Sequence, residues 1–448
     1  MPGGLIQLVA FGAQNYYLNG NPSVSFFKKV YKTYTNFSME SMKVIFNKNF
    51  IQFNEPTKLI AKIPRNADLI QEIYFSFELP DIRKQIKKNQ ETDVIIGDDF
   101  RYVKHLGEVM IDNYYIYIGG TIVDTHYGEW LHIWNELSIP SSKKYGYDKM
   151  IGNIPEMYLP DAFDQKFKQD EIQIYKRRFY VPLTFWFNKN PGLALPLIAL
   201  QYHEIEIHLE LRPYKDLFTV NEVKQTTWEP YFDNSILNIN PHLEVNYIFL
   251  DTNERNYFAK TSQDYLIEQV KRIPLYNIKQ YDINELNIQN PVKEIIWVCS
   301  RNDASDFNTW FEYVDNQYVE KSDYMDDDEC KCRYIVTEKE ILTSATLLLN
   351  GLERFEEKEG SYFNLIQPYQ YHTVIPKAGI YVYSFSLHPE SFQPSGTCNM
   401  SRINKIELKT EIKKIPTDET YNYDMFVYVV NYNFLKITGG LAGIAFSS

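Results

Sequence analysis

The sequence predicts an all-β protein in which one β architecture occurs twice. Residues 179–187 are typical of an aromatic strand, a loop containing Pro and Gly follows, and an alternating strand occupies 200–211. The same order of parts returns at 381–387, 389–396 and 403–408. Short strands separated by turn signals, with little helix, are typical of β-sandwiches or jelly rolls. Two such domains suit a chain of 448 residues, because sandwiches of roughly 200 residues fold as single units.

The composition supports two folded cores. Aromatic residues make up 16% of the chain, with 36 Tyr and 28 Phe, and charged residues make up 23%. These side chains supply apolar area and favour strands, so we expect most of the chain to be ordered. A chain with two matched domains and no catalytic constellation is more plausibly a building block than an enzyme.

The first part of the chain divides into an arm and a domain. Residues 1–24 mix Gly, Asn and Pro with apolar side chains, which predicts an N-terminal arm that packs on another surface. Residues 25–213 form the first predicted domain, in which apolar and polar residues alternate with the period of a strand. Its clearest strands are expected at 72–79, 109–118, 121–125 and 200–211. The Gly119–Gly120 pair predicts a tight hairpin between the second and third of these.

A helix interrupts this alternation. The spacing of one helical face occurs at Trp130, Ile133, Trp134 and Leu137. We expect this helix to cap the end of a sandwich.

The second part begins with a candidate linker, residues 214–240, between Pro213 and Pro241. Residues 241–448 are predicted to form the second domain with a C-terminal tail. Its expected elements are a strand at 243–250, a short helix within 256–269, and strands at 295–298, 345–349, 380–387, 403–408 and 425–435.

Charge is unevenly distributed along the chain. The formal net charge is −12, but residues 1–67 contain eight Lys or Arg and two Glu, a net +6, which leaves −18 for the remainder. A basic first segment is compatible with an anionic surface such as lipid headgroups. It is equally typical of a solvated strand edge that carries Lys, and the spaced-out lysines favour this second interpretation.

The expected compartment is a reducing cytoplasm. Four cysteines are too few for a disulfide scaffold, and the start of the chain lacks the basic region of a secretory signal. The longest apolar stretch, 193–200, contains Pro196 and is far shorter than the ~18 residues that span a bilayer, so we expect a soluble chain.

No catalytic, cofactor-binding or metal-binding residues are predicted. His203 and His208 lie in an alternating segment, where their side chains would project from opposite faces of a strand and could not share a metal. The acidic stretch around Asp326 has Lys331 where a calcium loop needs Gly, which favours a solvated loop. Phosphate-loop, nucleophile-elbow and dinucleotide motifs do not occur.

Several segments carry a resemblance to a known family. They include GGLIQLVAFGAQNYYLNGNP at 3–22, its continuation at 26–37, LPLIALQYHE at 195–204, and the segments 362–369, 393–402 and 431–435. In this order they resemble the major capsid proteins of nucleocytoplasmic large DNA viruses, a group that includes phycodnaviruses, iridoviruses and mimivirus-like viruses. The departures are Asn15, Asn19 and an acidic insertion near Asp326.

This resemblance implies two consecutive eight-stranded jelly rolls, a double jelly roll with short helices in its loops. It also implies a homotrimeric, pseudo-hexagonal capsomer that tiles the icosahedral shell of a large double-stranded DNA virus. The implied partners are further copies of the chain, neighbouring capsomers, minor capsid and penton proteins, and an internal viral membrane, with no direct binding of nucleic acid. The implied location is the virion capsid, with synthesis and assembly in the host cytoplasm.

The resemblance also implies roles for two segments. The N-terminal arm would lie at the base of the capsomer, and its candidate assembly residues are Leu5, Leu8, Phe11, Tyr17, Phe26 and Phe27. The acidic stretch 321–333, which contains Cys330 and Cys332, is the candidate for an exposed tower loop.

Two other classes of function stay open at this point. The many Tyr and Trp residues permit a carbohydrate-binding or receptor-binding β-sandwich, in which exposed aromatics stack on the ligand. A hydrolase on a jelly-roll scaffold is the third class, although the sequence offers no acid/base pair for it.

Overall fold

The computed structural model describes residues 3–83, 87–88, 95–96, 100–158, 172–220, 236–319, 334–415 and 420–446. The chain divides into two compact units, Met1–Phe37 and Ser38–Ser448. None of the helices described is long and apolar enough to cross a lipid bilayer.

Two antiparallel sheets form the first roll of the larger unit. In hydrogen-bonding order, one sheet contains β1 (Phe37–Ile45), β17 (His242–Leu250), β4 (Leu69–Leu79) and β12 (Arg177–Pro182). The other contains β10 (Thr121–Tyr127), β9 (Ile111–Ile118), β14 (Ile205–Leu211) and β3 (Thr57–Lys62). Side chains from both sheets, such as Phe75, Phe77 and Ile207, meet in one buried core.

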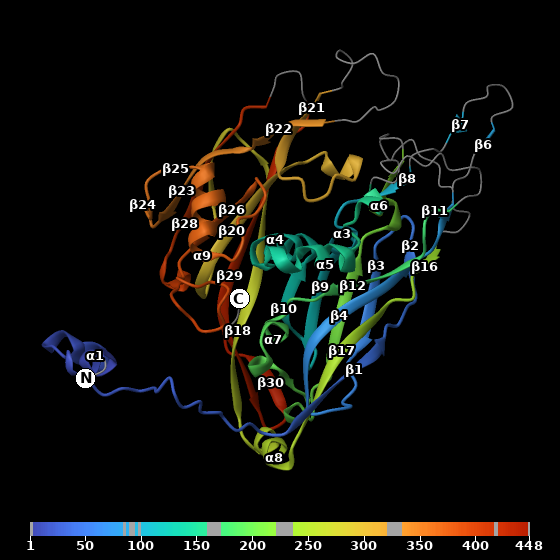
Figure 1. Cartoon of the computed structure of the whole chain (residues 1–448). Helices are drawn as coiled ribbons and strands as arrows, with labels where there is room; N and C mark the ends of the chain where they lie inside the picture. The colour runs from blue at the N-terminus through green and yellow to red at the C-terminus, as the bar shows by residue number, and fades with distance from the viewer. Residues whose placement is uncertain are drawn as a thin grey trace. The chain divides into compact units, whose positions relative to one another are not determined.

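The second roll repeats this arrangement strand for strand. One sheet has the order β18 (Gln263–Ile278), β29 (Tyr423–Thr438), β20 (Pro291–Arg301) and β26 (Ile380–Ser384). The other has the order β19 (Tyr281–Glu285), β28 (Ile406–Ile412), β23 (Leu342–Leu349) and β24 (Leu352–Glu353). Taken in chain order, each strand has the same neighbours as its counterpart in the first roll. Figure 1 shows the strands of the first roll mainly in blue to green and those of the second roll mainly in yellow to red.

The repetition includes a small detail of the loops. The two-residue strand β13 (Leu195–Pro196) pairs with β4, and its counterpart β27 (Cys398–Asn399) pairs with β20. Eight strands in two sheets with this order are a jelly roll. The predicted double jelly roll is therefore confirmed.

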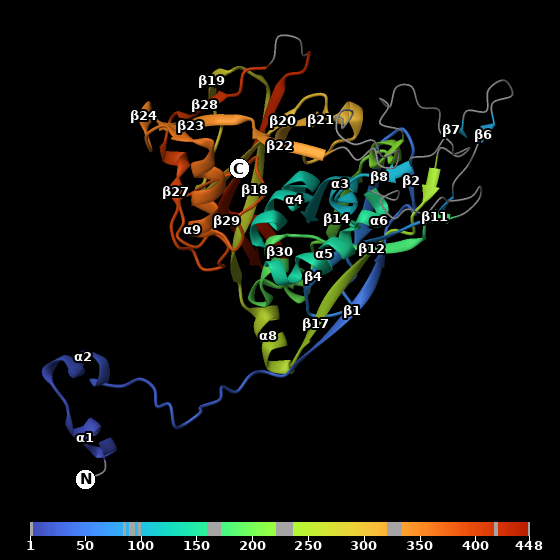
Figure 2. The same cartoon turned by 45° about the horizontal axis from the view of Figure 1, so that its top comes forward.

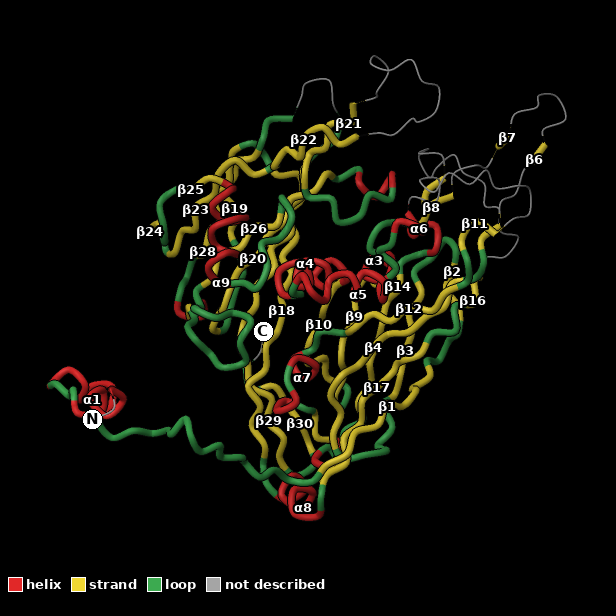
Figure 3. Tube along the Cα trace, in the orientation of Figure 1, coloured by secondary structure: helices red, strands yellow, loops and turns green. Residues whose placement is uncertain are grey.

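Short strands and helices occupy the connections, and Figure 3 shows how little of the described chain is helical. The remaining strands are β2 (Phe50–Gln52), β5 (Ile82–Arg83), β6 (Lys87–Lys88), β7 (Ile95–Ile96), β8 (Phe100–Tyr102), β11 (Ile172–Ile174), β15 (Phe218–Val220), β16 (Ile236–Asn238), β21 (Val314–Val319), β22 (Tyr334–Glu340), β25 (Lys358–Glu359) and β30 (Leu441–Ile444). The helices of the larger unit are α3 (Leu106–Met110), α4 (Gly128–Ser138), α5 (Ser141–Ile151), α6 (Pro155–Tyr158), α7 (Trp186–Lys189), α8 (Thr252–Lys260), α9 (Gln367–Tyr371) and a π-helical turn at Tyr362–Ile366.

Local sequence signals placed several elements correctly. The hairpin between β9 and β10 turns at Gly119 and Gly120, whose φ angles of +60° and +80° glycine adopts readily. The apolar residues of β14 are all buried. The strand is shorter than predicted, because a 3-10 turn at 197–199 and a bend at 201–202 precede it and leave Tyr202 exposed.

The predicted boundary between the domains is wrong at β17. The sequence interpretation assigned residues 241–250 to the second domain, but β17 pairs with β4 and completes the first roll. The predicted linker 214–240 also contributes strands to the first roll, because β15 pairs with β8 and β16 pairs with β2. Alternation identifies a strand without identifying the sheet that it joins, so we propose that the division lies within residues 251–262.

The predicted helix at 256–269 is only partly correct. It begins earlier, where the Asp251 side chain caps α8 by accepting a hydrogen bond from the Glu254 amide at 2.9 Å. Residues from Gln263 onward belong to β18, which pairs with β29 along its length.

Candidate functional site

The N-terminal unit exposes its apolar side chains. It contains α1 (Gly3–Val9) and α2 (Tyr16–Asn19), and none of its side chains whose burial is described is buried. Leu5, Leu8, Phe11, Phe26 and Phe27 are all exposed. The sixth predicted assembly residue, Tyr17, lies in α2, and its side chain is outside the described part of the structure. Exposed apolar groups gathered in one segment are typical of an interaction surface.

The two rolls meet at α4. This helix comes from the connection between β10 and β12 of the first roll, and its predicted apolar face is buried. That face packs on the sheet of the second roll that contains β18, β29, β20 and β26. Figure 2 shows the helix α4 beside β18 and β20. The prediction that the helix caps the end of a sandwich is therefore wrong. The partners in this cluster, which we call the junction core, are Val270, Ile296, Val298, Tyr313, Ile380, Val382, Tyr428 and Val430.

Strand β20 shows the consequence of this packing. Ile295 and Trp297 face the core of the second roll, whereas Ile296 and Val298 face α4. Successive side chains of a strand point to opposite faces, so a strand covered on both faces is apolar at successive positions. The junction core thus gives the second roll a buried outer face, which a free-standing jelly roll would expose to water.

Polar contacts flank the junction core. Glu129 of α4 accepts a hydrogen bond from the Tyr428 hydroxyl at 2.5 Å and lies 3.4 Å from Nη2 of Arg272. Burial, followed by the nearby Glu129 carboxylate, raises the pKa of Tyr428 well above its usual value, which keeps the hydroxyl a donor. Gln269 donates from Nε2 to the Val123 carbonyl oxygen at 2.6 Å and joins β18 to β10.

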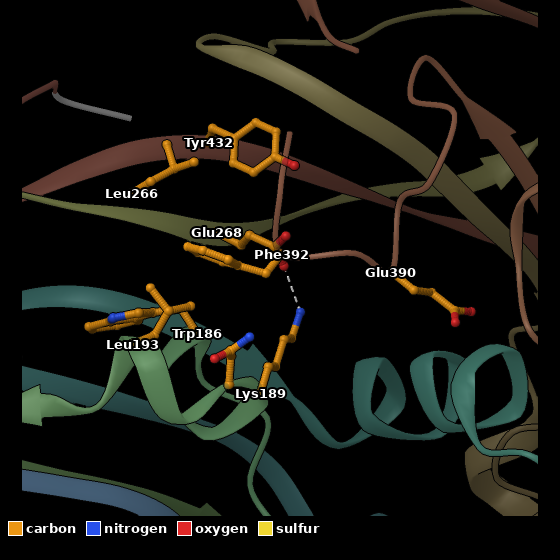
Figure 4. Close-up of a pocket in the computed structure, with 9 residues that line it drawn as sticks. Trp186, Lys189, Leu193, Leu266, Glu268, Glu390, Phe392 and Tyr432 are labelled. Carbon is orange, nitrogen blue, oxygen red and sulfur yellow. Dashed lines mark hydrogen bonds and ion pairs between the residues drawn. The ribbon is translucent and has the colours of Figure 1, made fainter. Parts of the chain in front are cut away.

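A largely buried carboxylate, 15% exposed, forms a second connection between the rolls. Glu268 of β18 lies 2.7 Å from Nζ of Lys189 in α7 and 2.6 Å from Nζ of Lys293 in β20. Burial alone would raise the pKa of Glu268, but the two ammonium groups lower it to about 2. Figure 4 shows the Lys189 contact beside a cavity of about 110 Å³, which Trp186, Leu266, Phe392 and Tyr432 help to line. Because the Glu268 carboxylate is already paired with two lysines, we interpret this small cavity as part of the contact between the rolls and not as an active site.

A cluster of buried polar groups joins α4 to α3 and α5, and we call it the His105 cluster. Glu108 of α3 accepts hydrogen bonds from Asn135 at 3.0 Å and Tyr147 at 2.5 Å, and it lies 3.0 Å from Nδ1 of His132. Burial, followed by the neighbouring His132, lowers the pKa of His105 well below its usual value, so that imidazole is neutral at neutral pH. No motif in the sequence marks this cluster, because its members are spread from residue 105 to 147 without a regular spacing.

The histidines singled out from the sequence have separate contacts. His203 accepts a hydrogen bond from the Ala442 amide at 3.1 Å, and His208 lies 2.9 Å from Glu206. The predicted tower loop, residues 321–333, lies outside the described residues.

Comparison with known proteins identifies the family. The description "Major capsid protein N-terminus" matches residues 25–251, and "Large eukaryotic DNA virus major capsid protein" matches residues 254–443. The chain is similar to the major capsid proteins of Pyramimonas orientalis virus, at 36% identity, and Phaeocystis pouchetii virus, at 34%, and each alignment covers 100% of both chains.

Solved structures agree with these relatives. The quasi-atomic model of the PBCV-1 virus capsid matches with a TM-score of 0.73 and 29% identity, covering 95% of this chain and 100% of that one. The Faustovirus major capsid protein has the same fold, with a TM-score of 0.72 at 14% identity and coverage of 97% and 96%. The chain therefore belongs to the family of major capsid proteins of large eukaryotic DNA viruses, and it is a structural component of the virion capsid rather than an enzyme.

Proposed function

We propose that three copies of this chain form one capsomer with a pseudo-hexagonal outline, and that such capsomers tile the icosahedral shell of a large DNA virus. The observation that carries the proposal is the strand-for-strand equivalence of the two rolls. Three copies of a chain with two like rolls present six similar rolls around a threefold axis. A surface of that outline tiles with its neighbours as a hexagon does.

The junction between the rolls supports this role. A capsomer keeps a sixfold outline only if the two rolls of each chain hold a constant orientation. The junction core, the Glu129–Tyr428 hydrogen bond and the paired Glu268 all connect the first roll to the second. This connection is internal to the chain, so it is present before any copies associate.

The oligomeric state of the purified full-length chain tests the proposal. Size-exclusion chromatography with light scattering is expected to give the mass of three chains, and electron microscopy of that peak is expected to show a hexagonal outline. A monomer that binds glycans would contradict the capsomer and favour the carbohydrate-binding or receptor-binding alternative.

The N-terminal unit is the proposed assembly arm. Its apolar side chains would lie at the base of the capsomer, against other components of the particle. They are the exposed Leu5, Leu8, Phe11, Phe26 and Phe27, together with Tyr17 in α2. The proposed components are neighbouring capsomers, minor capsid and penton proteins, and an internal viral membrane, with assembly in the host cytoplasm. The lysines of the basic first segment would suit an anionic membrane surface.

Deletion of residues 1–24 is expected to prevent or impair shell assembly while the rolls stay folded. The reason is that the larger unit forms a compact body by itself, beginning at Ser38. Assembly of particles is followed by electron microscopy, and folding is followed by circular dichroism and thermal unfolding.

Two variants of full length test whether the deletion acts through the loss of apolar side chains or only through a shorter chain. Leu5, Leu8 and Phe11 replaced together by Ser should reproduce the assembly defect, whereas Gln7→Ser with Gln14→Ser should not. Normal shells from the deletion and from the apolar-to-Ser variant would refute an assembly role for the arm.

A further inference from the structure

The His105 cluster brings together a set of side chains that bind metals. His105, His132 and Glu136 each offer a ligand atom, and these atoms lie within 4.8 Å of one another. All three residues are buried. The carboxylate of Glu108 adjoins them, 3.0 Å from Nδ1 of His132 and 3.5 Å from Nδ1 of His105.

One nitrogen of the cluster has no hydrogen bond. His105 is 6% exposed, and its Nδ1 is buried without a hydrogen-bond partner although it faces the Glu108 carboxylate. A buried polar atom left without a hydrogen bond destabilises the fold, because it has lost its contact with water. Most such atoms in folded proteins have a partner, so this nitrogen requires an explanation.

We propose that His105, His132 and Glu136 bind a divalent transition metal, with Zn²⁺ as the expected ion. Two imidazoles and one carboxylate are a donor set that zinc accepts, and zinc takes four ligands in most sites. The neighbouring Glu108 carboxylate is placed either to complete the coordination or to orient His132.

The side chains around the cluster hold its ligands in place. Glu108 is kept in place by Asn135 and Tyr147, which leaves a fixed carboxylate beside both histidines. Lys144 contacts Oε1 of Glu136 at 2.6 Å, and a carboxylate can bond to a lysine through one oxygen and to a metal through the other. The ring of Phe311, from the second roll, stacks on His132 with centroids 4.9 Å apart and shields the cluster.

A metal at this position would strengthen the junction between the rolls. His105 is the N-cap of α3, whereas His132 and Glu136 belong to α4, the helix that packs on the second roll. One ion would therefore join α3 to α4 and fix the helix that carries the junction core.

Cobalt binding to the full-length protein tests the site. The protein is treated with EDTA, the chelator is removed, and Co²⁺ is titrated while its visible absorption is followed, with Zn²⁺ as the competitor. The informative variant is His105→Asn, which removes the imidazole. Asn tolerates the left-handed backbone at this position, where φ is +54°. The matched control is His208→Asn, which removes a buried histidine that is paired with Glu206 elsewhere in the fold.

We expect one Co²⁺ per chain in the wild-type protein and in His208→Asn, displaced by Zn²⁺. His105→Asn should bind at least about tenfold more weakly, since even the loss of an outer-shell partner weakens metal sites by about 10–100-fold. Zn²⁺ should also raise the Tm of the wild type and the control but not of His105→Asn, as expected for a ligand that binds only the folded state. Wild-type protein that binds no Co²⁺, or equal binding by the two variants, would overturn the proposal.

Discussion

Replacement of Trp130 by alanine is expected to lower the free energy of unfolding by about 3–5 kcal/mol, the range for a buried Trp that leaves a cavity. Trp130 is fully buried between the rolls, where its ring stacks on Trp134 with centroids 5.6 Å apart and tilts against Tyr428 at 5.5 Å. The substitution removes one of the two tryptophans of α4 from the junction core, and neither sheet can close the space without moving. Denaturant unfolding followed by far-ultraviolet circular dichroism measures the effect.

The control for this prediction is Tyr145→Ala. Tyr145 is also aromatic and lies on the adjoining helix α5, but it is 72% exposed, so its loss should change stability by no more than about 0.5 kcal/mol. If Trp130→Ala were as mild as Tyr145→Ala, the junction core would not be a stabilising contact between the rolls. The proposed rigid pairing of the rolls would then lose its main support.

Glu268→Gln is expected to cost about 3–5 kcal/mol, because removal of one partner leaves a buried charge without compensation. The side chain of Lys293 is 1% exposed and pairs with Glu268 at 2.6 Å. Glutamine has nearly the same volume as glutamate, so the substitution changes charge without opening a cavity. Denaturant unfolding at neutral pH measures the loss.

Glu204→Gln is the matched control. Glu204 pairs with Lys62 at 2.9 Å, but the side chains are 70% and 65% exposed. Exposed pairs of this kind contribute little to stability, because water and salt screen the two charges. Equal losses in the two variants would show that the Glu268 pairing is no stronger than a surface ion pair.

The pH dependence of the free energy of unfolding tests whether the negative charge of Glu268 causes this stabilisation. The pKa of Glu268 falls from an ordinary 4.5 to about 2 in the folded protein. A carboxyl with a depressed folded pKa stabilises the protein fully above its unfolded pKa and loses that contribution as the pH falls through the folded pKa. The stability difference between wild type and Glu268→Gln should therefore be constant above pH 4.5 and shrink as the pH falls toward about 2. A difference that does not change over this range would contradict the assignment.

Local residue patterns were sufficient for several of the strands, the hairpin and the buried face of α4. The alternation in β14 identified its buried residues, and Gly119 and Gly120 identified the turn, because both signals arise within a few residues of the chain. The spacing of the apolar residues in α4 likewise identified the face that is buried. The repeated order of parts predicted the duplication, which the sheet order confirms.

The same patterns could not identify partners across the fold. The sequence determined by itself where many of the strands lie and which of their side chains avoid water, since strand and helix periods depend on neighbouring residues. Only the tertiary structure decided that β17 joins β4, that α4 covers the second roll, and that Glu268 meets Lys189 and Lys293. These contacts join residues far apart in the chain, and their free energy depends on burial and charge pairing that exist only after both rolls have folded.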